Sequence, residues 1–73
     1  MSDAREERGR RIRSARRDAG LTVEALAVAL GRNVDTIYRW EQGRSSPSVD
    51  EVVTIARVTG RLPSYFVSAE AAA

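Results

Sequence analysis

The chain has 73 residues, a formal net charge of +2, no histidine and no cysteine. A chain this short forms one small domain, with too little core to enclose a deep substrate pocket. The missing residue types exclude a disulfide framework and a thiolate nucleophile, and they remove the usual zinc ligands and the commonest general base. We therefore expect a binding protein and not an enzyme, with no metal site and no cofactor.

The sequence is also that of a soluble chain, with 42% hydrophobic and 30% charged residues. No apolar run approaches the roughly 20 residues that cross a bilayer, and no apolar stretch follows the polar N-terminus as in a secretory signal. These features predict a cytoplasmic protein with no membrane contact.

The first predicted helix runs from about Ala4 to Ala19 and carries most of the charge. Residues 1–20 hold seven arginines and four acidic residues, a net charge of +3. Its apolar face is thin, with Ile12, Ala15 and Ala19, and Gly9 weakens its start. The arginines fit either a phosphate-facing surface or a solvated helix with Glu–Arg pairs, and the small basic excess favours the solvated helix.

Glycines and capping residues mark the bounds of the next helices. Four glycines each follow a helical stretch, where a left-handed residue is favoured: Gly20, Gly31, Gly43 and Gly60. Three N-cap candidates follow, of which the last forms a capping box with Glu51: Thr22, Asn33 and Ser48. The predicted helices run from about Val23 to Leu30, from about Val34 to Gln42 and from about Val49 to Thr59.

Apolar spacing predicts the buried face of each helix. Leu26, Ala27 and Leu30 share a face of the second helix, and Ile37 and Trp40 point inward from the third. The fourth helix has Val49, Val52, Val53 and Ala56 at i, i+3, i+4 and i+7. A fifth helix begins at about Pro63, ends at about Ala69 and brings Tyr65 and Phe66, which we expect in the core like Trp40.

The predicted fold is all-α, a compact bundle of five short helices forming a single domain over residues 1–73. We expect a folded core at about 9–67 and frayed ends at 1–7 and 69–73. The turn Gly31-Arg32-Asn33 joins two helices of about two turns each, which makes them cross steeply as in a helix-turn-helix. In DNA-binding proteins of this kind the second helix enters the major groove.

The residues around this turn resemble the lambda-repressor/Cro-like family, the xenobiotic-response-element type of helix-turn-helix. The similarity runs from about Gly9 to Phe66. Its marks are Arg16, Gly20-Leu21-Thr22, Leu26-Ala27, Leu30-Gly31, Thr36-Ile37, Glu41, Gly43, Pro47 and Ile55-Ala56.

The resemblance implies a bacterial or phage-encoded transcriptional regulator that binds a specific sequence of double-stranded DNA. One recognition helix reads only about four to six base pairs, so a homodimer on a two-fold operator is expected. No small-molecule ligand is implied. The alternative is a protein-interaction module that keeps the scaffold and has lost DNA binding.

Four residues of the third helix point outward and are the candidates for reading bases: Val34, Asp35, Tyr38 and Arg39. Arg39 fits a two-bond contact to guanine, or it is simply solvated. Asp35 fits a cytosine amino group or the helix dipole alone, and Val34 fits a thymine methyl or the core. Tyr38 fits a phosphate or a sugar.

Contacts to the DNA backbone are expected from helix N-termini and from the loop after the third helix. The candidates are Thr22, Val23, Asn33, Thr36, Arg44 and Ser45. Val23 departs from the family, which usually has glutamine there. The resemblance further implies a partly buried ion pair between Arg16 and Glu41, whose disruption would cost about 3–5 kcal/mol.

Overall fold

The computed structural model describes residues 3–67, and within that range all regular structure is helical. The helices are α1 (Ala4–Asp18), α2 (Val23–Leu30), α3 (Val34–Glu41) and α4 (Val49–Thr59), followed by a single helical turn at 64–67. The predicted all-α fold of five short helices is confirmed. α1 and α3 each end one residue before the predicted position, and the predicted end of the fifth helix, at Ala69, lies outside the described residues. Within the described range, no helix is both long and apolar enough to cross a bilayer.

Side-chain caps begin each of the four helices, as the local sequence predicts for the last three. Thr22 Oγ1 accepts from the Ala25 amide at 3.0 Å, and Ser48 and Glu51 form the predicted capping box, with bonds of 3.2 and 2.9 Å. Asp3 and Glu6 form a second capping box, which begins α1 at Ala4. Residues 4–7, where fraying was expected, are therefore helical.

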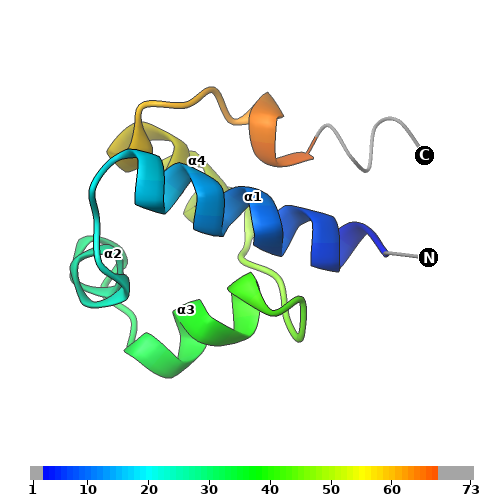
Figure 1. Cartoon of the computed structure of the whole chain (residues 1–73), viewed down its shortest axis with the longest axis horizontal. Coiled ribbons are helices and arrows are strands. Elements are labelled where there is room, and N and C mark those ends of the chain that lie inside the picture. Colours follow the sequence, from blue (N-terminus) through cyan, green and yellow to red (C-terminus); the bar gives the residue numbers. More distant parts are fainter. Residues whose placement is uncertain (1–2, 68–73) are drawn as a thin grey trace.

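α1 lies across the middle of the molecule, between α3 and the turn at 64–67 (Figure 1). It packs against α3 and α4, and α2 packs against the same two helices. The core that they enclose consists of Ile12, Ala15, Val23, Leu26, Ala27, Ile37, Trp40, Val52, Ile55, Ala56 and Phe66. α3 is consequently left along one edge of the bundle, with its outer face open to solvent (Figure 1).

Of the three aromatic residues predicted in the core, Trp40 and Phe66 are buried, at 2% and 1% exposed. Tyr65 is half-buried. Its ring contacts Phe66 edge-on at 5.1 Å between centroids and lies beneath the guanidinium of Arg61. The Tyr65 ring thus lies at the edge of the core, beside the last helical turn.

The buried face of α4 differs from the predicted one. Val52 and Ala56 are buried as expected, but Ile55 joins them, while Val49 is 80% and Val53 45% exposed. α4 carries apolar residues around most of its circumference, so two different i, i+3, i+4 stripes fit its sequence. Packing selects the stripe with isoleucine, which buries the largest apolar side chain of the helix.

Gly9 has a packing role that the sequence did not predict. It is buried, and a Cβ atom there would lie 2.6 Å from the Glu41 carbonyl oxygen and in still closer contact with that of Trp40. Its missing side chain lets the backbone of α1 approach the end of α3 directly. This close approach fixes how the outer face of α3 is presented.

Candidate nucleic-acid interface

The turn between α2 and α3 has the form that a helix-turn-helix requires. Gly31 ends α2 with φ of 66°, a left-handed conformation that suits glycine, and the Arg32 amide donates to the Ala27 carbonyl at 3.0 Å. Asn33 then caps α3, accepting from the Thr36 amide at 3.0 Å. α3 can therefore start immediately after α2 in a new direction.

Arg32 fastens this turn to the rest of the bundle. Its guanidinium bonds Glu51 of α4 at 2.7 Å and lies 5.7 Å from the centre of the Trp40 ring. The sequence alone does not predict this role, because Glu51 is distant along the chain and no local pattern links the two residues. Arg32 is thus a structural residue beside the interface.

The outer face of α3 brings together three of the four predicted base-reading side chains. Asp35, Tyr38 and Arg39 are all exposed, while Ile37 and Trp40 on the opposite face are buried. This is the inward and outward division that the sequence predicts.

The fourth candidate, Val34, is half-buried and packs against the core cluster. Only part of its side chain remains for a base contact. The core alternative therefore accounts for much of this side chain, and its predicted base contact stays a prediction.

Charge on this face comes from Asp35 and Arg39. Within residues 3–67 the structure gives neither of them an ion pair, so both are available to a ligand. Arg39 lies one turn beyond Asp35, in the last turn of α3. Its planar guanidinium offers paired donors of the kind that match two acceptors on one base edge.

The candidates for backbone contact at the helix starts differ in which hydrogen-bond donors they still have available for a phosphate. The Thr22 hydroxyl accepts from Ala25 and can still donate its own proton. The Thr36 hydroxyl already donates to Asn33 Oδ1 at 3.1 Å, so a phosphate would have to replace that bond. Asn33 itself is exposed at the cap of α3. The free amides at both helix starts are the donors best placed for phosphate.

Val23 is only 7% exposed and belongs to the core. Its side chain is therefore buried, although Val23 is one of the predicted candidates for a backbone contact. Any contact that this residue makes with DNA comes from its main-chain amide at the start of α2. The burial also gives a structural reason for valine at a position where the family usually has glutamine.

The loop after α3 holds the two remaining candidates. Arg44 is exposed and Ser45 is half-buried, and the Arg44 amide donates to the Arg39 carbonyl at 2.9 Å. The loop is also tied to α1, since buried Arg8 donates to Ser46 Oγ at 2.8 Å. Arg44 therefore projects from a loop that is anchored at both ends.

Arg16 and Glu41 form the ion pair that the family resemblance implies. Arg16 Nε and Nη2 lie 2.6 and 3.1 Å from the two oxygens of the Glu41 carboxylate, and the side chains are only 12% and 7% exposed. The hydrogen bond to Glu41 raises the pKa of Arg16, against the opposing effect of burial. Arg16 also donates to the Leu21 carbonyl at 3.0 Å, so it joins α1, α3 and the start of the helix-turn-helix.

Comparison with known proteins shows similarities in both sequence and structure. The profile of the helix-turn-helix domain family matches residues 7–64. An uncharacterized HTH-type transcriptional regulator of Methanothermobacter thermautotrophicus is 46% identical over 50 residues, which cover 68% of this chain and 72% of that protein.

Two solved structures share the arrangement of helices. The clp gene regulator ClgR from C. glutamicum superposes with a TM-score of 0.84 at 25% identity, covering 99% of this chain and 94% of that one. An HTH_3 family transcriptional regulator from Vibrio cholerae has a TM-score of 0.74 at 23% identity over 90% of this chain and 37% of its own. The second likeness is one of fold.

Proposed function

The chain belongs to the helix-turn-helix domain family and is a DNA-binding transcriptional regulator, and we propose that it reads base edges in the major groove with α3, as a homodimer on a two-fold operator. The observation that carries the proposal is the outer face of α3, where Asp35, Tyr38 and Arg39 project from a helix held by buried Ile37 and Trp40. Regulation then follows from occupancy, because a bound dimer blocks or recruits polymerase. No catalytic step is involved, and the protein acts in the cytoplasm, where the DNA is.

Each outward side chain of α3 has a role that its chemistry favours. Arg39 binds O6 and N7 of a guanine through two hydrogen bonds, and Asp35 accepts from a cytosine amino group. Tyr38 reaches a sugar or a phosphate, and the exposed part of Val34 contacts a thymine methyl. Phosphate contacts hold the domain in register on the DNA. In the loop after α3 they come from Arg44 and Ser45. At the starts of α2 and α3 they come from Thr22, Val23, Asn33 and Thr36.

Arg39→Ala is the substitution that tests base reading. We expect it to weaken binding to the preferred operator by about 1–3 kcal/mol and binding to random DNA much less, because a base contact is lost and a phosphate contact is not. Specificity should relax at one base pair in each half-site. The operator is first selected from a random DNA pool, and both affinities are then measured at two salt concentrations.

Equal losses on operator and random DNA, with a shallower salt dependence, would instead make Arg39 a phosphate contact. A wild-type protein without salt-dependent DNA binding would contradict the proposed function as a whole. That outcome would favour a protein-interaction module, which keeps the helix-turn-helix without using it on DNA.

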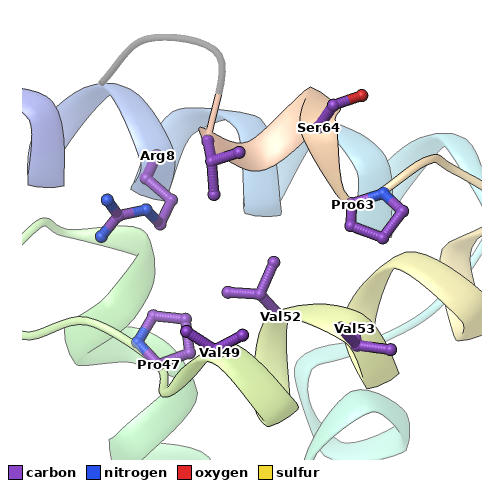
Figure 2. Close-up of a pocket in the computed structure, with 8 residues that line it drawn as sticks. Arg8, Pro47, Val49, Val52, Val53, Pro63 and Ser64 are labelled. Carbon is purple, nitrogen blue, oxygen red and sulfur yellow. The ribbon is translucent and has the colours of Figure 1, made fainter. Parts of the chain in front are cut away.

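An exposed apolar pocket supports the dimer. Val49 and Val53 of α4 lie on one side of it and Pro63 on the other (Figure 2). Pro47, which leads out of the anchored loop after α3, also lines this pocket. A second copy of the chain seated here would lie next to the DNA-facing loop, as a dimer on adjacent half-sites requires.

Val53→Glu tests this placement of the dimer. A carboxylate in an apolar interface costs desolvation energy, so we expect the dissociation constant of the dimer to rise at least about tenfold. The association constant is measured by sedimentation equilibrium. Val28→Glu is the matched control, because Val28 is 82% exposed on α2 and does not line the pocket, and it should leave the constant unchanged. Equal dimerisation of both variants would contradict this interface.

A further inference from the structure

The arginines of α1 differ in what they contact, although the sequence presents them as one basic segment. Arg10 and Arg11 both bond the Glu7 carboxylate, at 2.6 and 3.3 Å. The hydrogen bond from Arg10 lowers the pKa of Glu7, so this carboxylate stays charged and offsets part of the local positive charge at neutral pH. These residues match the solvated helix with Glu–Arg pairs that the sequence favours.

Two further arginines of α1 are used inside the fold. Arg16 is neutralised by Glu41, and Arg8 is buried and bonds Ser46. Both guanidinium groups are therefore already bonded within the fold. Arg5, Arg13 and Arg17 are exposed, and the structure gives none of them an ion pair within residues 3–67.

Arg13 is the one of these three that adjoins the outer face of α3. It lines a groove between α1 and α3 together with Tyr38 and Gln42, and the floor of this groove includes the Arg16–Glu41 pair. Because that pair is internally neutral, Arg13 supplies the uncompensated charge of the groove. Arg17, one turn further along α1, lines only a second groove, which Arg13 also lines and to which α3 contributes no residue.

We propose that Arg13 binds the phosphate backbone of DNA at the α1 edge of the α3 interface. The inference rests on the proposed function, since it requires α3 to lie in the major groove. A backbone strand borders that groove on each side of an inserted helix, and an arginine on a flanking helix meets phosphate before it reaches a base. Arg13 then fixes orientation, while the side chains of α3 itself read sequence.

Arg13→Ala tests the inference on the intact chain. Binding to the selected operator and to random DNA should both weaken about three- to fivefold at low salt, which is the usual range for an exposed charge contact. The slope of log K against log[salt] should become shallower by about one unit, because one fewer counterion is released. The preferred operator sequence should not change.

Arg57→Ala is the charge-matched control, because Arg57 is exposed on α4 and lines neither groove. It should leave the salt slope unchanged. An unaltered slope for Arg13→Ala, or equal slopes for both variants, would overturn the inference while leaving DNA binding by α3 intact. A change in preferred sequence would overturn it by making Arg13 a base reader. A wild-type protein that shows no specific DNA binding would overturn both proposals together.

Discussion

Replacing Glu41 with glutamine should lower the free energy of unfolding by about 3 kcal/mol, because Arg16 would be left as a buried cation without its counter-charge. Both side chains are largely shielded from water, at 12% and 7% exposed, and two short bonds join them. Glutamine keeps the shape and one acceptor, so the expected loss lies at the low end of the range for broken buried pairs. For a chain of this length it is still a large share of a total stability of roughly 4–11 kcal/mol.

The loss is measured by urea unfolding, with fluorescence of the buried Trp40 as the probe. Glu7→Gln is the matched control: Glu7 also pairs with arginines, but at the surface of α1, and its replacement should leave the midpoint nearly unchanged. DNA binding by Glu41→Gln should fall only with the fraction of folded protein. An unchanged unfolding midpoint would show that the pair contributes no stability.

The parts of the fold that the sequence predicted well are those decided within a few residues. A cap such as Thr22 or Asn33 bonds an amide three residues further along, and Gly31 adopts its left-handed conformation at the same turn. Because these interactions are local, residue type and spacing predict them. The outward position of Asp35 and Arg39 follows in the same way from helical periodicity once Ile37 and Trp40 are buried.

The buried face of α4 was beyond local reasoning, because both of its apolar stripes satisfy the spacing rule. Packing against α1 and α2 buries Ile55 and leaves Val49 and Val53 outside. The burial of the Val23 side chain was also beyond local reasoning, because the family pattern gives that position a DNA contact whereas the valine side chain packs in the core.

The different roles of the arginines of α1 could be predicted from the sequence only in part. Arg10 and Arg11 have Glu7 three and four residues before them, the spacing of helical ion pairs, whereas Arg13 has no acidic residue three or four positions away on either side. The sequence therefore indicates that Arg13 has no ion-pair partner within its own helix. The sequence does not predict which residues surround Arg13, since the groove beside Tyr38 exists only once α1 and α3 pack together.

Gly9→Ala is expected to destabilise the protein by about 2–3 kcal/mol, although alanine is the better helix former by about 1 kcal/mol. The added methyl group would meet the backbone oxygens of Trp40 and Glu41 and not a flexible side chain. The Trp40 carbonyl is itself held by the Gly43 amide at 3.1 Å, so it cannot turn away without breaking the end of α3. α1 and α3 would have to separate, which opens the core around Ile12 and Ile37.

Ser14→Ala is the control for helix propensity, because Ser14 is exposed on the same helix and an alanine there meets no close packing. It should be neutral or slightly stabilising in the same urea titration, so the two substitutions should have opposite signs. The operator affinity of the folded Gly9→Ala protein should also fall, since its α3 is displaced relative to α1. A Gly9→Ala protein more stable than the wild type would mean that α1 stands further from α3 than the structure places it. The groove shared by Arg13 and Tyr38 would then be wider, and the phosphate contact assigned to Arg13 would lose its geometric basis.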